Sequence, residues 1–502
     1  MRSVPGRPPR RLTPRASGHF AVASAHPLST AAGLETLRSG GNAYDAALAV
    51  SAALPVVQPH MNGLGGDFFA VIHEGRSSVA VNSSGPSGRR ATPGFFRERG
   101  YSRIPTRGPL AALTVPGLVG AWPFLAERGH LRWREALAPA IRLAARGFPA
   151  SPSLARASRS TAWADPDFRA IYRSVRAGHR FRQTGMARSL ARIATDKGYG
   201  FYHGGLAREI CRDLAAKGGL LTPKDFDAYR PTVGPPLRLR YRQYVVETNP
   251  PPSQGATALI WLNLLSRREL SSVGEPEFAS ALEETMYTAY GYRARCIGDP
   301  AWVRFPRSLL RTTAVYRVAS REPGGPPGTS DTTAFSVFDG RVGISAIQSN
   351  YMGFGSGISI RGTGINLNNR ASYFTLDPDH PNVLAPEKRT FHTLMATVAT
   401  GPRTVLLGSM GGDVQPQVNV QVLSRHLDRG LAIDRAIAAP RFAYPASIYA
   451  TAPLFREPGL PLRRARILHQ PSAFGHAQGI SVGDDLQVGV DPRGDGLLPL
   501  PS

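Results

Sequence analysis

A Gly- and Pro-rich segment, residues 321–329, stands directly before an alternating run of hydroxyl and apolar residues, 330–338. The segment predicts an exposed loop in which cleavage is tolerated, and the run predicts a β-strand that begins at Thr332. A threonine at a new N-terminus would carry its own base, the free α-amine, which can activate its hydroxyl as a nucleophile. The pattern therefore predicts a chain that cuts itself between Asp331 and Thr332. The alternative, favoured by the local sequence alone, is that Thr332 simply opens a strand, because Thr favours strands.

The composition is that of an ordinary globular protein with an excess of positive charge. Of the 502 residues 42% are hydrophobic and 8% aromatic, and the formal net charge is +25. Beyond the first fifteen positions the basic residues, almost all Arg, are scattered, whereas a nucleic-acid surface concentrates them on one face beside a recognised motif. We therefore expect no specific nucleic-acid partner, and a polyanion-binding protein is kept only as an alternative.

Residues 1–18 are basic and Pro-containing but lack the apolar stretch that a secretory signal needs. We expect a disordered leader there, and cytoplasmic residence. No apolar window approaches the eighteen residues of a membrane-spanning helix, so we expect no membrane partner. Cys211 and Cys296 fit neither a disulfide framework nor a metal site, and His26 and His60 fit no metal-ligand spacing. We expect no metal and no cofactor.

Predicted strands gather near both ends of the chain, while residues 117–300 are mainly helical. The predicted elements are a strand at 20–24, a helix that Ser29 can cap, a helix at 44–54, and strands at 68–73, 78–82, 237–241, 244–248, 332–338 and 342–349. This grouping favours stacked layers over a parallel sheet. We predict an α+β fold, a four-layer αββα sandwich, with a doubly wound α/β fold as the alternative.

Short motifs occur in a fixed order along nearly the whole chain. They lie at residues 23–27, 40–47, 59–67, 114–117, 250–255, 331–333, 354–357, 367–369, 388–389 and 408–412. No single motif decides, but together, over residues 19–496, they resemble the gamma-glutamyltranspeptidase family of N-terminal nucleophile hydrolases. The resemblance implies that a proenzyme cuts itself into a large subunit, 19–331, and a small subunit, 332–502, which together build one sandwich.

The resemblance also implies the roles of the reacting groups. The Thr332 hydroxyl would attack the Asp331 carbonyl, an acyl shift would give an ester, and water would release the large subunit. Ser349 stands where the family has a hydroxyl bonded to the nucleophile, although a solvated serine at a strand end is an equal alternative. Gly411 and Gly412 would donate backbone N–H groups to the oxyanion.

The positions that hold the γ-glutamyl group in the family carry different residues here. They are Tyr351, Arg370, Tyr373, His392 and Thr393. The family's Arg is missing or displaced around residues 83–90. Arg370 invites a second carboxylate or an oxamate-like anion, which its planar fork can bind through two hydrogen bonds; a surface salt bridge is the alternative. This pattern is similar to the acylase-like and amidohydrolase-like branches, such as glutaryl-cephalosporin acylase and oxamate amidohydrolase.

We therefore predict an autoprocessed amide hydrolase or acyltransferase for γ-glutamyl compounds, such as glutathione, or related dicarboxylic amides, with water or an amine as acceptor. A glutaryl-cephalosporin acylase-like enzyme, an oxamate amidohydrolase-like enzyme and a non-catalytic family member are the alternatives. The resemblance further allows a homodimer of the two-subunit unit, and it makes a periplasmic or secreted location the alternative to the cytoplasm.

Overall fold

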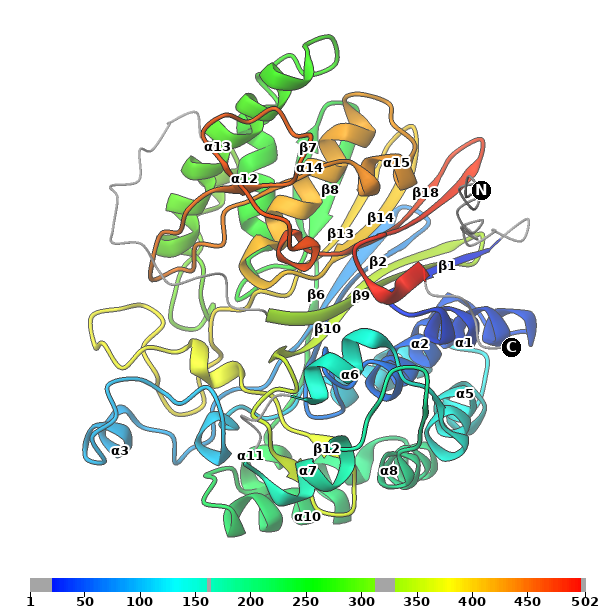
Figure 1. The fold of residues 1–502 in the computed structure, drawn as a ribbon, viewed down its shortest axis with the longest axis vertical. Coiled ribbons are helices and arrows are strands. Elements are labelled where there is room, and N and C mark those ends of the chain that lie inside the picture. The colour runs from blue at the N-terminus through cyan, green and yellow to red at the C-terminus, as the bar shows by residue number, and fades with distance from the viewer. Residues whose placement is uncertain (1–19, 160–163, 312–329, 498–502) are drawn as a thin grey trace, which may run out of the picture.

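The structure is a computed structural model that describes residues 20–159, 164–311 and 330–497. The predicted leader, 1–18, and the predicted loop, 321–329, lie outside the described residues. Figure 1 shows a central pair of sheets with helices on both outer sides. Among the described helices, none is both long and apolar enough to cross a membrane.

Two six-stranded sheets form the centre, and every pair of neighbouring strands in them is antiparallel. The first has the order β1 (Ala21–Ser24), β9 (Ser330–Phe338), β10 (Val342–Met352), β2 (Asp67–Glu74), β3 (Ser77–Ser83), β6 (Thr232–Gly234). The second has the order β19 (Leu486–Val490), β18 (Ala477–Val482), β14 (Thr404–Ser409), β13 (Ala396–Thr400), β8 (Tyr244–Thr248), β7 (Leu237–Tyr241). The antiparallel ladders contradict the doubly wound alternative, which requires parallel strands.

The two sheets pack face to face through a shared apolar layer. Its buried members include Phe69, Ala334, Ile347, Leu406 and Ile480. A polar link crosses the same layer, because Ser345 Oγ donates a hydrogen bond to the Leu407 carbonyl oxygen at 2.9 Å. The sheets are therefore fixed relative to each other near the strands that carry the candidate site.

Helices cover both outer faces, which completes the predicted αββα sandwich (Figure 1). The first sheet is covered chiefly by α1 (Pro27–Arg38), α2 (Ala43–Val57), α5 (Trp133–Arg146) and α8 (Thr184–Asp196). The second is covered by α12 (Gly255–Leu265), α13 (Glu275–Cys296), α14 (Gln415–Leu427) and α15 (Ile433–Ala438). The other α-helices are α3 (Pro93–Arg97), α4 (Trp122–Ala126), α6 (Pro152–Ser158), α7 (Pro166–Tyr172), α9 (Tyr199–His203), α10 (Gly205–Ala216) and α11 (Pro223–Asp227).

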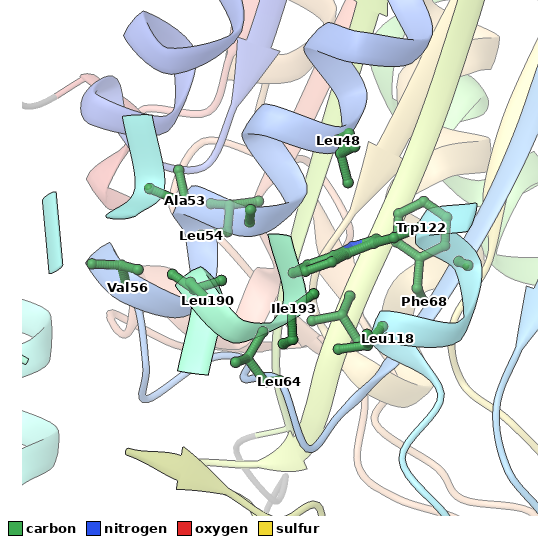
Figure 2. Close-up of a cluster of buried hydrophobic side chains, with 14 of the residues drawn as sticks. Leu48, Ala53, Leu54, Val56, Leu64, Phe68, Leu118, Trp122, Leu190 and Ile193 are labelled. Atoms are coloured by element: carbon green, nitrogen blue, oxygen red, sulfur yellow. The ribbon is translucent and has the colours of Figure 1, made fainter. Parts of the chain in front are cut away.

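Helix α2 is apolar on all sides and buried along its whole length, as expected of a helix enclosed between other layers. Figure 2 shows Leu48 of this helix pointing toward Trp122, in the cluster that also contains Leu54 and Phe68. Within this core Trp122 Nε1 donates to Ser51 Oγ at 2.9 Å, and Ser51 Oγ donates to Gln348 Oε1 at 2.8 Å. The core thereby fixes Gln348, which immediately precedes Ser349 on β10.

Several predicted boundaries were wrong. Helix α1 begins at Pro27, and its cap is His26, whose Nδ1 accepts the Leu28 N–H at 3.2 Å. The predicted cap, Ser29, is instead bonded to Ser24 Oγ at 2.6 Å. Strand β9 begins at Ser330, and β10 continues past residue 349 to Met352. Thr332 is therefore the third residue of its strand and not its first.

Candidate active site

Three groups meet at the peptide bond that the sequence marks for cleavage. Thr332, which is 1% exposed, donates from Oγ1 to Ser349 Oγ at 3.2 Å. Ser349 Oγ in turn donates to the carbonyl oxygen of Asp331 at 2.7 Å, and it accepts the Tyr351 N–H at 2.7 Å. Ser349 is also 1% exposed, so the alternative of a solvated strand-end serine is wrong. Its hydroxyl connects the attacking oxygen to the carbonyl that would be attacked.

A β-bulge produces this arrangement. Strand β10 pairs Gln348 with Thr333, and the ladder resumes only at Tyr351 with Asp331. One extra residue therefore lies on β10 opposite Thr332, and bulges of this kind turn a side chain away from its regular direction. The bulge directs the Ser349 hydroxyl at the backbone of the opposite strand rather than away from it.

Gly411 and Gly412 form a turn directly after β14. The ladder between β14 and β18 ends at Ser409, so the N–H groups of the following glycines lie outside it. Their φ angles are +133° and +54°, a region that favours glycine, and a Cβ on Gly411 would lie 2.6 Å from Val414 Cγ2. The short helix η5 (Gly412–Val414) contacts β9, so the predicted oxyanion turn lies next to the strand that carries Thr332.

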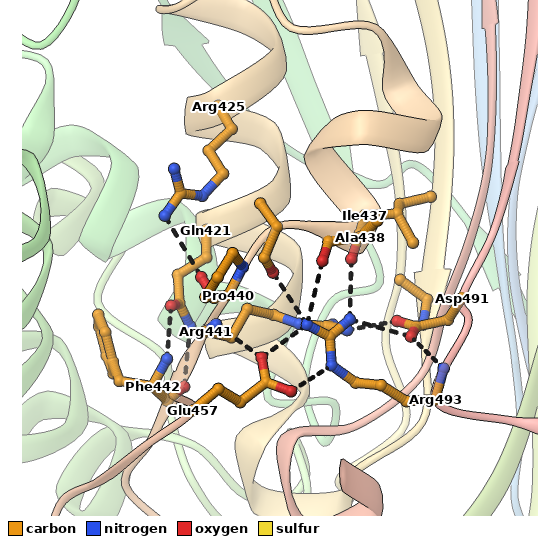
Figure 3. A network of polar contacts seen from close by, with 12 residues as sticks. Gln421, Arg425, Ile437, Ala438, Pro440, Arg441, Phe442, Glu457, Asp491 and Arg493 are labelled. Carbon is orange, nitrogen blue, oxygen red and sulfur yellow. Dashed lines mark hydrogen bonds and ion pairs between the residues drawn. The ribbon is translucent and has the colours of Figure 1, made fainter. Parts of the chain in front are cut away.

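A buried ionic network holds the segment that supports this turn (Figure 3). Asp491 accepts the Ala477 N–H at 2.9 Å and forms ion pairs with Arg441 and Arg493. Burial alone would raise the Asp491 pKa, but the two guanidiniums hold it below its usual value. Ala477 begins β18, and the preceding carbonyl, that of His476, accepts the Met410 N–H at 2.8 Å.

A cavity of about 900 Å³ opens beside the scissile bond. Its lining includes Asp331, Tyr351, Tyr373, Gly411 and Asp413. Of the predicted substrate-binding residues, Tyr351 and Tyr373 therefore reach the cavity. The other three lie behind its wall and are buried; they are Arg370, His392 and Thr393.

Sequence reasoning missed two charged residues here: Asp413, which lines the cavity, and Arg293, which is bonded to it. Asp413 Oδ1 accepts the Tyr373 hydroxyl at 2.6 Å and Arg293 Nη1 at 2.9 Å. Burial raises the Asp413 pKa, although Arg293 and Tyr373 oppose the change. Asp413 directly follows the two glycines, a position that could have signalled its role. Arg293 belongs to the long helix α13 and carries no local signal.

The buried positions behind the wall form a second polar group. His392 Nδ1 accepts the Leu394 N–H at 3.1 Å, so its proton is on Nε2, which donates to Asp67 Oδ2 at 3.0 Å. Arg370 Nη1 donates to Thr393 Oγ1 at 3.0 Å, and Arg370 Nε lies 3.9 Å from Asp67 Oδ2. Burial raises the Asp67 pKa to about 7, while burial and Arg370 lower the His392 pKa well below its usual value. Because Arg370 is 1% exposed, the surface salt bridge is wrong.

One arginine, Arg107, lies near the scissile bond, and it comes from a region that the sequence motifs did not mark. Arg89, within the segment where the family's Arg is missing, is exposed and pairs with Glu387. Arg107 instead donates to the Gly353 carbonyl oxygen at 2.7 Å and lies near Asp331. Burial raises the Asp331 pKa to about 7, and Arg107 opposes that change.

Gln254 connects the glycine turn to the polar group behind the wall. Its Nε2 donates to the carbonyl oxygens of Thr393 at 2.8 Å and Gly412 at 2.7 Å, while its Oε1 accepts Arg293 Nη1 at 2.9 Å. Gln254 is completely buried at the start of α12. Gln254 belongs to the motif at residues 250–255, and no role for it was predicted from the sequence. Its contacts are those of a residue that positions Gly412.

We expect Gln254→Leu to lower kcat about tenfold to a hundredfold with little change in KM. The substitution keeps the side-chain volume but releases Gly412, so the oxyanion donors lose their fixed direction. Gln421→Leu is the matched control, because Gln421 is also buried and hydrogen-bonded, to the Phe442 backbone, far along α14. Steady-state kinetics and thermal unfolding of both variants check this; equal kcat losses would contradict the assigned role.

The residues described by the structure contain no group of three or more His, Cys, Asp or Glu side chains that could hold a metal ion. The site brings together the Thr332 hydroxyl, the Ser349 hydroxyl and a glycine turn whose N–H groups lie outside the β14–β18 ladder. Such a set is suited to acyl transfer.

Comparison with known proteins agrees with this chemistry. A family model described as Gamma-glutamyltranspeptidase matches residues 29–498. The chain belongs to the gamma-glutamyltranspeptidase family. It is 36% identical to the glutathione hydrolase-like YwrD proenzyme of Bacillus subtilis, over 95% of this chain and 97% of that protein. It is 35% identical to the oxamate amidohydrolase proenzyme of Klebsiella pneumoniae, over 85% of each chain.

Among solved structures, the cephalosporin acylase from Bacillus halodurans matches with a TM-score of 0.88 and 33% identity, over 99% of this chain and 98% of that one. The predicted family, the fold and the enzyme class are thereby confirmed. In this gamma-glutamyltranspeptidase family member the roles of the individual site residues and the subunit boundaries remain predictions.

Proposed function

We propose that this chain is the precursor of a two-subunit amide hydrolase or acyltransferase that cuts itself between Asp331 and Thr332 and then uses Thr332 as its nucleophile. One observation carries the proposal: the hydrogen-bonded line from Thr332 Oγ1 through Ser349 Oγ to the Asp331 carbonyl oxygen. The proenzyme names of the relatives support the two-subunit product, 19–331 and 332–502.

These two hydrogen bonds suit self-cleavage because the attacking hydroxyl and the carbonyl oxygen are each bonded to Ser349 Oγ. Thr332 Oγ1 attacks the Asp331 carbonyl carbon while its proton passes to Ser349, whose own proton moves toward the carbonyl oxygen. The C–N bond then breaks, the Thr332 nitrogen takes up a proton, and an ester joins the two residues. Water hydrolyses the ester, which gives a carboxylate on Asp331 and a free amine and hydroxyl on Thr332.

The new amine serves as the base for turnover on external substrates. Its ordinary pKa of about 7.7 to 8.0 leaves much of it neutral near pH 8, where it accepts the Oγ1 proton as the hydroxyl attacks a substrate amide. Gly411 and Gly412 N–H groups stabilise the oxyanion, and the leaving amine departs with a proton. Water or an amine then removes the acyl group from Thr332.

We further propose that the acyl group carries a free carboxylate rather than a γ-glutamyl ammonium and carboxylate pair. Arg370 and Arg293 place two buried cations at this end of the site, so an ammonium would need an anionic partner there. Asp413 lines the cavity and is a candidate partner, but Arg293 and Tyr373 already occupy one of its oxygens. The relatives named oxamate amidohydrolase and cephalosporin acylase support this choice, and the one named glutathione hydrolase-like supports the γ-glutamyl alternative.

We expect glutaryl-p-nitroanilide to be hydrolysed with a kcat/KM at least about tenfold higher than γ-glutamyl-p-nitroanilide, since the buried arginines disfavour an ammonium. The two substrates differ only in that ammonium, so they control for each other. Release of p-nitroaniline gives the rates, and mass spectrometry of the same preparation shows whether the chain is cut. A strong γ-glutamyl preference contradicts the acyl assignment. A single chain that cleaves neither compound favours the non-catalytic alternative.

A homodimer of the two-subunit unit and a cytoplasmic location, with a periplasmic or secreted one as the alternative, remain predictions for this protein.

A further inference from the structure

Two nitrogen atoms of Arg370, Nε and Nη2, have no hydrogen-bond partner among the described residues. The side chain is 1% exposed, and its hydrogen bond from Nη1 goes to Thr393 Oγ1. Asp67 supplies charge at 3.9 Å from Nε but no hydrogen bond. Buried guanidinium groups are normally hydrogen-bonded, so Nε and Nη2 form an open edge of the guanidinium that could bind a carboxylate through two hydrogen bonds.

The Tyr351 ring covers this guanidinium. Arg370 Cζ lies 4.3 Å from the ring centroid, and Tyr351 lines the cavity whereas Arg370 does not. Tyr373 supports the ring from another side in an edge-on contact at 5.5 Å. A carboxylate in the cavity therefore meets Tyr351 before it can reach the free donors of Arg370.

The backbone of Tyr351 is held in a conformation that a bulky residue rarely adopts. Its φ is +80°, a region in which an aromatic residue is a genuine outlier. Two contacts keep it there: its N–H donates to Ser349 Oγ, and its partner in the ladder between β9 and β10 is Asp331. Both contacts belong to the scissile bond or to the hydroxyl that contacts it.

Cleavage removes one of these restraints. In the uncut chain Asp331 is continuous with Thr332 and is thereby kept in register opposite Tyr351. Once the bond is broken, Asp331 becomes a chain end that carries a new carboxylate and is no longer covalently held in β9. Strained residues persist only where their surroundings fix them, so Tyr351 loses part of what fixes it.

We propose that cleavage before Thr332 frees Tyr351 to move off Arg370, whose Nε and Nη2 then bind the carboxylate of the acyl substrate. The inference rests on the proposed function and deepens it. Tyr351 is, in this view, a specificity-determining residue that keeps the carboxylate site closed in the precursor. It explains why the guanidinium is buried in the uncut chain and why two of its three nitrogens have no partner among the described residues.

Binding of glutarate to uncleaved protein tests the inference. We expect Thr332→Ala/Tyr351→Gly to bind glutarate at least tenfold more tightly than Thr332→Ala, as measured by isothermal titration calorimetry. Glycine removes the ring and accepts the positive φ without strain. Glutaramide, the neutral diamide, is the matched probe and should show no gain. Thr332→Ala/Tyr351→Phe keeps the ring and should behave like Thr332→Ala.

Two further measurements test whether cleavage opens the site and whether Arg370 is the group that binds glutarate. In cleaved protein, wild type and Tyr351→Gly should bind glutarate within about twofold of each other, because the site is already open. Adding Arg370→Gln to the Thr332→Ala/Tyr351→Gly protein should abolish the gain, with thermal unfolding to check the fold. If that variant is unfolded, the glutarate and glutaramide pair still decides.

Equal glutarate affinity in the two uncleaved proteins, or a gain that glutaramide shares, overturns the inference. If the wild-type protein is cut and active, but Tyr351→Gly does not change glutarate binding in the Thr332→Ala protein, the inference is refuted and the proposed function is not. A wild-type chain that stays whole refutes the proposed cleavage, and with it the release step.

Discussion

Thr332→Ala is expected to leave the protein as one chain of 53.9 kDa and to lower amide hydrolysis by at least about 10³-fold, the scale of loss when a nucleophile is removed. The substitution removes the oxygen that would attack the Asp331 carbonyl, and without cleavage no free amine forms. Denaturing electrophoresis, mass spectrometry and the p-nitroanilide assay measure the two losses.

Two variants control for effects on folding. Thr332→Ser keeps a hydroxyl at the same position and should still yield two chains. Thr333→Ala alters the neighbouring residue, which is equally buried but directs its hydroxyl to the Gln348 carbonyl oxygen at 3.4 Å, and it should be cut normally. If Thr332→Ala is cut, or if only Thr333→Ala stays whole, the nucleophile has been assigned to the wrong residue.

Ser349→Ala is expected to slow self-cleavage by about 10² to 10³-fold, the usual effect of removing one donor to a developing oxyanion. The Ser349 hydroxyl is bonded to the carbonyl oxygen on which that charge develops, at 2.7 Å. The fraction of cut chain against time after synthesis, read from denaturing gels, measures the rate.

Ser345→Ala is the matched control for this experiment. Ser345 lies on the same strand, is completely buried and donates to the Leu407 carbonyl oxygen at 2.9 Å, away from the scissile bond. Ser349→Thr restores a hydroxyl and should recover most of the rate. Equal cleavage rates for Ser349→Ala and Ser345→Ala would show that the bond to the Asp331 carbonyl plays no part.

The sequence alone was sufficient to bring Thr332 and Ser349 close together, because both residues belong to one hairpin. Strands predicted at 332–338 and 342–349 put Thr332 and Ser349 near opposite positions, and the structure places them 3.2 Å apart through their oxygens. The one-residue bulge that directs the Ser349 hydroxyl was not predicted. A bulge depends on what packs around the strand, here the contacts that fix Gln348, and strand periodicity carries no trace of it.

The wall of the cavity was predicted less well because its residues meet only in the folded chain. Arg293 lies in helix α13, 120 positions from Asp413, and several other arginines in the chain give the same local signal. The sequence singled out Arg370 because it stands at a position where the family has a different residue. Its burial behind Tyr351, however, depends on where the short helix η4 (Arg370–Tyr373) packs. Pairwise charge and stacking contacts between distant segments are tertiary effects, which local residue preferences do not determine.

The order of strands has a consequence for the cut protein. Strands β9 and β10, from the C-terminal product, lie between β1 and β2, from the N-terminal product, and β13 of the one pairs with β8 of the other. Severing one peptide bond would leave all three of these ladders intact, so the halves cannot drift apart without tearing both sheets open. Produced separately, each half would expose bare strand edges and be prone to aggregate, which makes a single-chain precursor the route by which this interleaved pair can be assembled.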